Sequence, residues 1–167
     1  ELKDGKVVIE LYKDDAPNHV ERIKELASEG KYDGVVFHRV IEGFMAQTGD
    51  VEHGNSKDFS KRRVGTGGSD LPDLKEEFND RKHIKGTCSM ARSASPDSAN
   101  SQFFICFDDS SFLDGQYTVW GQVIEGMEFV DNIKLGSSSD NGSVDEPDMM
   151  IKVTVGKAEK TKSASGK

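Results

Sequence analysis

Short stretches of alternating or clustered hydrophobic residues recur along most of the chain, separated by turn residues. Alternation with a period of two is typical of strands, and Gly, Pro, Asn and Asp mark the turns between them. On these grounds we expect strands over residues 6–12, 35–41, 44–48, 86–91, 102–107, 118–124 and 150–155.

Two segments have the spacing of helices. The first opens with Asp14, Asp15 and Pro17, which suit a first helical turn, and closes at Gly30. Its hydrophobic residues recur on one face: Val20, Ile23, Leu26 and Ala27. A shorter helix is expected over residues 127–133. Many short strands with two helices predict a mainly antiparallel β domain, in the form of a barrel.

Residues 52–73 depart from this pattern, because they are polar and Gly-rich and have no sustained periodicity. Long loops in compact domains are uncommon and tend to be functional. The basic patch Lys57, Lys61, Arg62 and Arg63 suits either a solvated loop or a docking place for an acidic partner. We expect one domain over residues 1–155 and a flexible Lys-rich tail over residues 156–167.

Composition and charge exclude several classes of function. Of the 167 residues 31% are charged, and no run approaches the ~18 apolar residues that a membrane-spanning helix needs. The whole chain carries −8; its last twelve residues carry +3, so residues 1–155 carry −11. A body this acidic repels phosphate backbones, so we expect neither nucleic acid nor membrane as a partner.

The cysteines and histidines give no sign of a metal or cofactor. Cys88 and Cys106 lie inside apolar segments, where a cysteine behaves as a small buried hydrophobe. The four histidines show neither helical pairing nor cysteine partners, so no metal site is expected. The GTGG at 65–68 lacks the Lys-Ser/Thr of a phosphate-binding loop. We expect no cofactor.

Three of the predicted strands carry polar residues on apolar faces. In 35–41, Val35, Phe37, Arg39 and Ile41 should share one face, and an arginine there is unusual for a core strand. In 44–48, Met45 and Gln47 share a face opposite to Phe44 and Ala46. In 102–107, Phe104 shares a face with Gln102 and Cys106, while Phe103, Ile105 and Phe107 form the other. A mixed surface of this kind is typical of a ligand site; the alternative is a solvated Arg39 and an ordinary second core face.

Two further patterns have alternative interpretations. Cys106 with His38 could form a nucleophile pair, although no orienting group is visible. Asn141-Gly142-Ser143 is either a glycosylation acceptor or a turn.

Five longer motifs resemble the cyclophilins, the cyclosporin-binding peptidyl-prolyl isomerases. These are FHRVIEGFMAQTGD (37–50), GTGG (65–68), SMARS (89–93), NSQFFICF (100–107) and FLDGQYTVWGQVIEGMEFVD (112–131). The motifs look bacterial rather than animal. The resemblance implies a closed eight-stranded antiparallel β-barrel capped by two α-helices, and isomerisation of X-Pro bonds without a covalent intermediate.

The resemblance also implies site residues. The catalytic arginine falls on Arg39, which would stabilise the twisted imide, with Gln47 and Phe104 as its catalytic partners. The substrate-binding positions are Phe44, Met45, Gly67, Gly68, Ala91, Arg92, Gln102, Phe112, Leu113 and Tyr117. None of the groove side chains named here is acidic, and Arg39 with Arg92 would make the groove locally positive.

Three departures from the family pattern qualify these expectations. Phe112 stands where many members have a Trp that donates a hydrogen bond to cyclosporin, so we expect weakened affinity for that drug. Tyr117 stands at a position that is often His. The family has a first strand before the Lys3–Lys6 hairpin, of which only Glu1 and Leu2 remain, and this bears on barrel closure.

The expected partners are proline-containing peptides and unfolded or flexible proteins, with the chain as a monomer in the cytoplasm or, alternatively, the periplasm. Two other functions stay open. One is a proline-peptide binding or chaperone module; the other is a Cys–His hydrolase.

Overall fold

The computed structural model describes residues 1–156 of the chain. Eight strands form within them: β1 (Val8–Leu11), β2 (Val35–Val36), β3 (Arg39–Ile41), β4 (Met45–Thr48), β5 (Thr87–Met90), β6 (Phe103–Cys106), β7 (Val119–Glu125) and β8 (Met149–Met150). The helices are α1 (Pro17–Ser28), α2 (Met127–Asp131) and the 3-10 turns η1 (Ser111–Leu113) and η2 (Ser138–Asp140). The expected mainly β domain with two α-helices is confirmed. Apart from Gly156, the tail expected over 156–167 lies outside the described residues.

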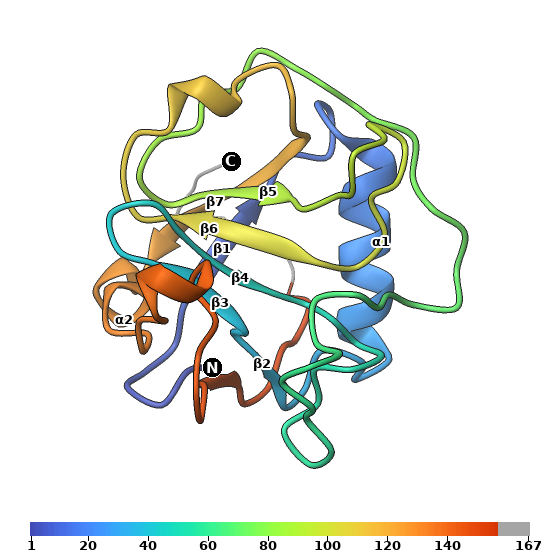
Figure 1. Cartoon of the computed structure of the whole chain (residues 1–167). Helices are drawn as coiled ribbons and strands as arrows, with labels where there is room; N and C mark the ends of the chain where they lie inside the picture. The colour runs from blue at the N-terminus through green and yellow to red at the C-terminus, as the bar shows by residue number, and fades with distance from the viewer. Residues whose placement is uncertain (157–167) are drawn as a thin grey trace.

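All strand pairs are antiparallel. Six strands form one sheet in the order β1-β7-β5-β6-β4-β3, and β2 pairs with β8 in a separate ribbon. Figure 1 shows α1 at the right of the strands and α2 at the left, and both helices contribute buried residues to the same core. Within residues 1–156 no hydrogen-bonded ladder joins β1 to β3, so the closed barrel stays a prediction. Glu1 nevertheless continues the ribbon, because its amine donates to the Lys152 carbonyl (2.7 Å) and its carbonyl accepts from Ile151 N–H (2.8 Å).

The main core lies on one face of the six-stranded sheet. Val40, Ala46 and Ile105 alternate onto this face from β3, β4 and β6, and all are buried. The Phe103 ring stands edge-on to Tyr32 (centroids 5.6 Å apart) and to Trp120 (5.2 Å). The apolar stripe of α1 covers the same core through Val20, Ile23, Leu26 and Ala27, as its spacing predicts.

Two predicted strands are wrong in extent. Residues 35–41 divide into β2 and β3, because Phe37 and His38 are both buried and the chain leaves the ribbon there to join the sheet. Val35 and Phe37 therefore belong to the main core, and Arg39 does not share their face. The last strand ends at Met150 rather than residue 155, since Val153 N–H donates to the Asp33 carboxylate (2.8 Å) instead of to a strand.

No helix among residues 1–156 is long and apolar enough to cross a bilayer.

The N-terminus of α1 is capped from a distant loop. Ala16 stands at the cap position without a side-chain acceptor, and Pro17 removes one of the donors of the first turn. The Glu77 carboxylate accepts from Asn18 N–H (3.1 Å), from His19 N–H (2.9 Å) and from the His19 ring at Nδ1 (2.5 Å). The negative charge also faces the positive end of the helix dipole.

We expect Glu77→Ala to lower the free energy of unfolding by about 2 kcal/mol, because it leaves two backbone donors and the buried His19 ring unsatisfied. Urea denaturation at pH 7 measures the change. Glu77→Gln keeps a neutral acceptor and should lose less. Glu21→Ala, which removes a 76% exposed carboxylate from the same helix, is the matched control; an equal loss in the control would contradict the capping role.

Candidate active site

Three polar and aromatic side chains form one row across the outer face of the sheet. Arg39 on β3 lies opposite Gln47 on β4, and Gln47 lies opposite Phe104 on β6. Directly opposite residues on antiparallel strands have Cβ atoms about 4.5–5.5 Å apart. The strand register therefore places the guanidinium, the amide and the phenyl ring side by side. Figure 1 shows the three strands that carry them, β3, β4 and β6, next to one another.

A directional chain of hydrogen bonds fixes the polar part of this row. Arg39 Nη1 donates to Gln47 Oε1 (3.2 Å), and Gln47 Nε2 donates to Gln102 Oε1 (3.0 Å). Gln102 Nε2 then donates to the Gly67 carbonyl (2.9 Å). A guanidinium can only donate and a carbonyl can only accept, so the two ends determine the orientation of both amides.

An apolar cluster adjoins the polar row. Met45, Phe104, Cys106 and Leu113 are buried together, and Phe44, Ala91 and Tyr117 pack against them. Phe104 meets Tyr117 edge-on, with ring centroids 5.8 Å apart. A hollow of about 490 Å³ opens above this cluster. Its volume falls in the range of small-ligand sites, and one side is apolar while the other carries Arg39 and Gln47.

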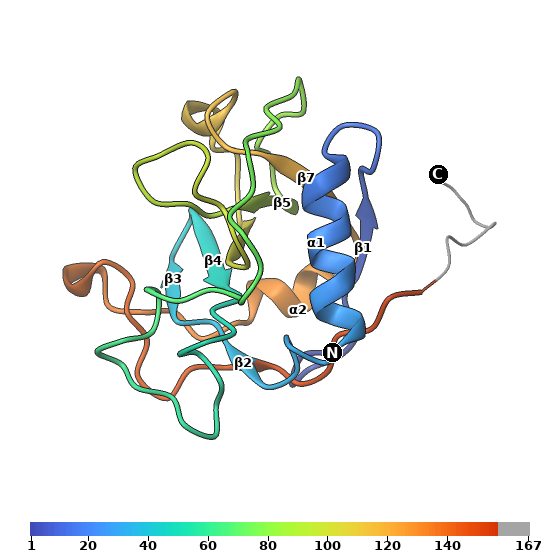
Figure 2. The same ribbon diagram turned by 90° about the vertical axis from the view of Figure 1, so that its right-hand side faces the viewer.

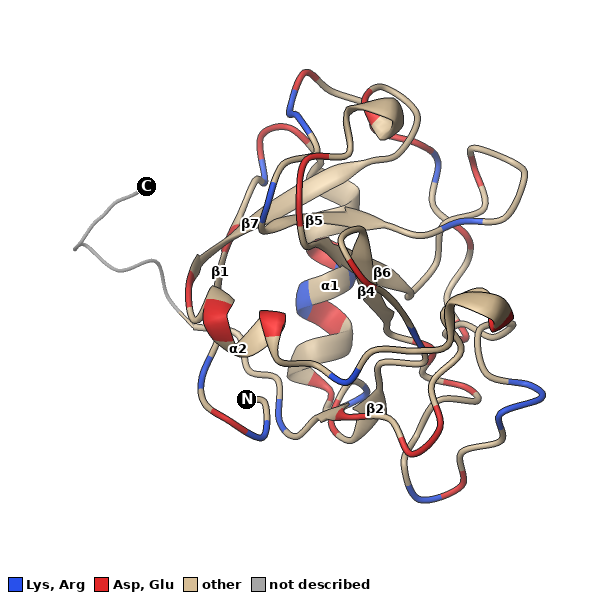
Figure 3. Cartoon of the chain, turned by 60° about the vertical axis from the view of Figure 1, so that its left-hand side comes forward, with Lys and Arg blue, Asp and Glu red and all other residues tan. Residues whose placement is uncertain are grey.

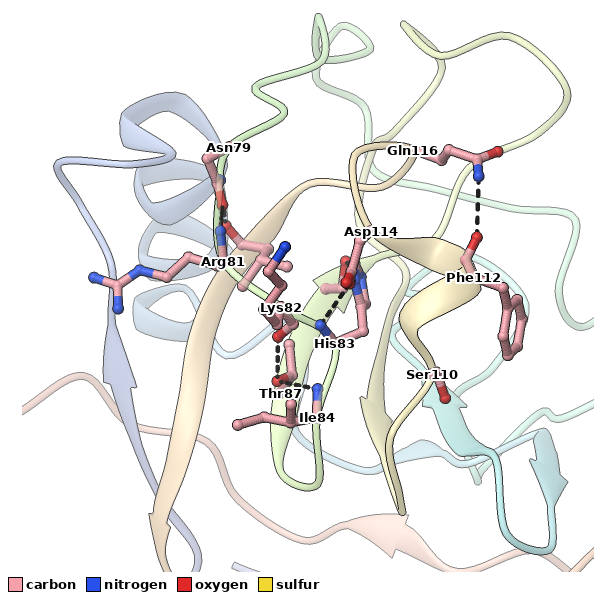
Figure 4. Close-up of polar contacts among 12 residues, drawn as sticks. Asn79, Arg81, Lys82, His83, Ile84, Thr87, Ser110, Phe112, Asp114 and Gln116 are labelled. Atoms are coloured by element: carbon pink, nitrogen blue, oxygen red, sulfur yellow. Dashed lines mark hydrogen bonds and ion pairs between the residues drawn. The ribbon is translucent and has the colours of Figure 1, made fainter.

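The turn η1, which carries Phe112 and Leu113, is tied to the segment before β5 (Figure 4). The Asp114 carboxylate accepts from His83 N–H (2.7 Å) and lies 2.9 Å from its ring Nδ1, and Ser110 N–H donates to the His83 carbonyl (2.8 Å). Gln116 Nε2 donates to the Phe112 carbonyl (3.0 Å). These bonds hold Leu113 at the hollow.

His83 also supports the floor of the hollow from behind. Its ring stacks on Phe104 with centroids 6.1 Å apart, and its Nε2 lies 2.9 Å from Ser89 Oγ. Burial lowers the pKa of His83, although the Asp114 carboxylate opposes the shift. The lowered pKa favours the neutral ring at pH 7, and Nδ1–H then donates to the Asp114 carboxylate, which can only accept.

The long loop after β4 is organised around one buried carboxylate. Asp50 is 0% exposed, and its two oxygens accept from four backbone N–H groups: those of Glu52 (3.1 Å), His53 (2.9 Å), Gly65 (2.7 Å) and Gly67 (3.1 Å). These bonds compensate the cost of burying the charge. They also bring residues 64–66 to the edge of the hollow.

Charge at the hollow is mainly positive. Arg39, Lys61 and Arg92 line it together with one acid, Asp140, which lies 3.9 Å from the Lys61 ammonium. Burial lowers the pKa of Arg39, but a guanidinium stays protonated at neutral pH. In Figure 3 the acidic residues lie mostly on loops and helices, while the strands are largely free of charge.

The sequence of the chain also matches the model of one protein family. A model described as cyclophilin type peptidyl-prolyl cis-trans isomerase/CLD covers residues 1–155. The chain belongs to this family. It is a peptidyl-prolyl cis-trans isomerase.

Related proteins agree with this assignment. The chain is 60% identical over 155 residues to a probable peptidyl-prolyl cis-trans isomerase of Brucella suis, covering 92% of this chain and 79% of the relative. It is 37% identical over 163 residues to peptidyl-prolyl cis-trans isomerase B of Escherichia coli, covering 90% and 94%. These relatives are bacterial, as the motifs indicated.

Solved structures share the fold. A cyclophilin from Hirschia baltica superposes with a TM-score of 0.75 at 28% identity, covering 91% of this chain and 70% of that one. A Cryptosporidium parvum cyclophilin crystallised in the presence of the dipeptide Ala-Pro superposes with a TM-score of 0.77 at 24% identity, covering 93% and 95%.

The structure of this cyclophilin brings most of the predicted site residues to one hollow. Its lining includes Arg39, Phe44, Met45, Gln47, Ala91, Arg92, Phe104, Leu113 and Tyr117. Gly67, Gly68, Gln102 and Phe112 do not line it. Gln102 and Gly67 belong to the hydrogen-bond chain behind Gln47, and the Phe112 ring, 65% exposed, lies against Phe44 at the rim (centroids 5.5 Å apart).

Sequence reasoning placed one residue, Phe44, differently. Phe44 was expected on the face opposite to Met45, but it precedes β4, so strand alternation does not apply to it, and it packs on the Met45 side. Gly68 stands beside Asn100, whose atoms a Cβ would approach to 3.0 Å. A side chain at position 68 would therefore have to displace Asn100.

Several lining residues were not among the predicted site residues. His38, Lys61, Asp140 and Asn141 lie at the hollow, and Arg39 donates to Asn141 from two of its nitrogens. Asn141 is 102 residues away from Arg39 along the chain, so no spacing rule connects the two. Within the described residues Nδ1 of His38 is buried without a hydrogen-bond partner.

The neutral state of His38 makes stability depend on pH. Burial lowers the pKa of His38 to about 4, against the opposing attraction of Asp50. The unfolded chain, with a pKa near 6.5, takes up the proton first as the pH falls. Protonation therefore favours unfolding, and the stability present above pH 6.5 is lost between pH 6.5 and about 4.

Between pH 7 and pH 5 we expect the free energy of unfolding of His38→Gln to fall by about 2 kcal/mol less than that of the parent protein, because the glutamine does not titrate. Urea denaturation at both pH values measures the two differences. Since His19 and His83 are present in both proteins, their titration cancels. An identical fall in the two proteins would contradict the assignment to His38.

Proposed function

We propose that this isomerase acts on X-Pro bonds of proline-containing peptides and of unfolded or flexible proteins, with Arg39 stabilising the twisted imide. The observation that carries the proposal is the cross-strand row, in which the Arg39 guanidinium and an apolar floor at Phe104 stand on either side of Gln47. The Cryptosporidium protein crystallised with Ala-Pro supports a proline-containing ligand for this fold.

The chemistry needs no covalent step. Resonance makes the imide planar, and rotation crosses a barrier of about 18–20 kcal/mol. When the bond twists, resonance is lost and a lone pair appears on the proline nitrogen. A donor placed at that nitrogen binds the twisted form better than either planar form, which is the requirement for lowering the barrier.

Arg39 is suited to this role by its remaining donors. A guanidinium has five N–H groups. Within the described residues three of them donate to Asn141 and Gln47, which leaves two for a substrate. Phe104, Met45, Phe44 and Leu113 would hold the proline ring, while Gln47 and the backbone at Ala91 and Arg92 would hold the flanking carbonyls.

The neighbouring residues complete the substrate site in this proposal. Gln102 would fix Gln47 through their hydrogen bond. Gly67 and Gly68 would form the wall for the residue before the X-Pro pair, and Tyr117 would close the proline pocket beside Phe104.

Two other functions are less well supported. A binding or chaperone module has no need of a guanidinium whose remaining N–H groups are available to a substrate beside the apolar cluster. A Cys–His hydrolase needs a thiolate, but burial raises the pKa of Cys106 to about 12, and no hydrogen bond joins it to His38 in residues 1–156. Ser89, His83 and Asp114 stand in the order of a hydrolytic triad, but Ser89 is 0% exposed and out of reach of a substrate.

The cellular context is also a proposal. We propose a monomer in the cytoplasm, with the periplasm as the alternative. Both cysteines are buried, which is compatible with either compartment. Cell fractionation and sedimentation test these points. We further propose that the strands close into a barrel, supported by the pairing of Glu1 with residues 151–152; a crystal structure with separate sheets would contradict it.

We expect Arg39→Ala to lower kcat for an X-Pro peptide by about 10²-fold or more, because the donor to the developing lone pair is lost. Peptide affinity should stay within a small factor. Phe104→Ala should instead weaken binding as well, since it empties the apolar seat. NMR exchange spectroscopy on one peptide measures both quantities, and undiminished turnover in Arg39→Ala would rule out the mechanism.

Affinity for cyclosporin should be limited by Phe112, which has no N–H to donate. We expect Phe112→Trp to tighten inhibition by cyclosporin about tenfold, the value of one hydrogen bond of about 1.4 kcal/mol. An inhibition titration measures the change. Phe112→Tyr, which adds a polar tip of different geometry, is the control; equal inhibition of all three proteins would show that this position does not set the affinity.

A further inference from the structure

Asn141 is the contact of Arg39 that sequence analysis left as part of a turn or glycosylation acceptor. It follows η2 directly and has a left-handed backbone, with φ 54° and ψ 33°. Arg39 Nε donates to its backbone carbonyl (3.1 Å), and Arg39 Nη2 donates to its side-chain Oδ1 (3.1 Å). Two oxygens of Asn141 thus accept from two nitrogens of the guanidinium, and Gln47 accepts from the third nitrogen.

The loop that carries Asn141 is attached to the strand that carries Arg39. Arg39 and Ser143 form an antiparallel bridge, and Val40 N–H donates to the Gly142 carbonyl (2.8 Å). Gly136 N–H in turn donates to the Val40 carbonyl (2.9 Å). Figure 2 shows this loop, with η2, beside β3 and on the side of the sheet away from α1.

Close packing allows little movement of this loop against the strand. A Cβ on Gly142 would come within 2.6 Å of the Ile41 side chain, and the φ of +81° at this residue favours glycine. Within the loop, Gly142 N–H donates to the Ser137 carbonyl (2.8 Å). The Lys61 ammonium, 2.5 Å from the Asp145 carboxylate, ties the following residues to the loop after β4.

An arginine side chain has many rotamers, and contacts to a fixed partner reduce their number before the substrate binds. The Asn141 loop is hydrogen-bonded to the strand that carries Arg39. The two acceptor oxygens of Asn141 are therefore held in place relative to the sheet that also carries Gln47. We propose that Asn141 is a positioning residue for Arg39, which orients the guanidinium so that its remaining N–H groups face the reacting imide. This inference rests on the proposed function, in which Arg39 is the catalytic group.

The left-handed backbone makes a selective test available. Asn141→Gly keeps the φ of +54° without strain and keeps the backbone acceptor, but removes Oδ1. Asn141→Asp keeps the acceptor, and Asp tolerates this conformation. We expect Asn141→Gly to lower kcat about tenfold with KM within twofold of the parent, and Asn141→Asp to restore most of the loss. NMR exchange spectroscopy with one X-Pro peptide measures both constants.

Two controls separate positioning from a general effect on the loop. Ser138→Gly adds a glycine to the same loop at an exposed residue that forms no hydrogen bond with Arg39 within residues 1–156, and its kcat should match that of the parent. In an Arg39→Ala background, Asn141→Gly should have no further effect on kcat, because there is no guanidinium to orient.

The results that would overturn the inference are distinct. An unchanged kcat in Asn141→Gly, an equal loss in Ser138→Gly, or an undiminished effect in the Arg39→Ala background would each contradict positioning while leaving the catalytic role of Arg39 intact. Full activity of Arg39→Ala would instead contradict the proposed function and, with it, this inference.

Discussion

The register between β3, β4 and β6 is the constraint on which the rest of the site depends. It sets Arg39, Gln47 and Phe104 in one row on the outer face and directs Val40, Ala46 and Ile105 to the core. A slip of one residue would exchange the two faces of a strand. A slip of β3 would bury an unpaired guanidinium, at a cost of several kcal/mol. The apolar core that stabilises the sheet therefore also enforces the alignment of the site.

Alternation along the sequence predicted the faces of these strands but not their partners. Within 102–107, Phe103 and Ile105 lie in the main core and Phe104 and Cys106 in the second cluster, as the pattern indicated. A period of two says which side chains share a face and gives no information on which strand lies opposite. The register of Gln47 against Arg39 and Phe104 came only from the structure. In 35–41 alternation failed because the chain leaves one sheet for another at Phe37 and His38, where burial is continuous.

The residues that sequence analysis missed were missed for one physical reason. Glu77 caps the helix that contains Asn18, and the two residues are 59 positions apart in the sequence. Asn141 accepts from Arg39, which is 102 positions away. Asp50 gathers four backbone N–H groups from a loop without periodicity. In each case a polar group from one segment satisfies donors of another. Such pairings depend on tertiary geometry, and local residue pattern does not record them. The family motifs located Arg39 and Phe104, but they are silent on the contacts that orient these side chains.

The distribution of titratable groups around the hollow is consistent with catalysis by a fixed charge. Burial lowers the pKa of His38 to about 4 and raises the pKa of Cys106 to about 12, so neither of these groups changes charge near neutrality, and burial also lowers the pKa of His83. Arg39 is charged and lies beside the apolar floor, and its protonation does not vary with pH in this range. A reaction that only twists a bond requires no proton to be transferred, but it requires a donor whose position is set before the substrate arrives. The neighbours of Arg39 accordingly act on its orientation and leave its charge unchanged.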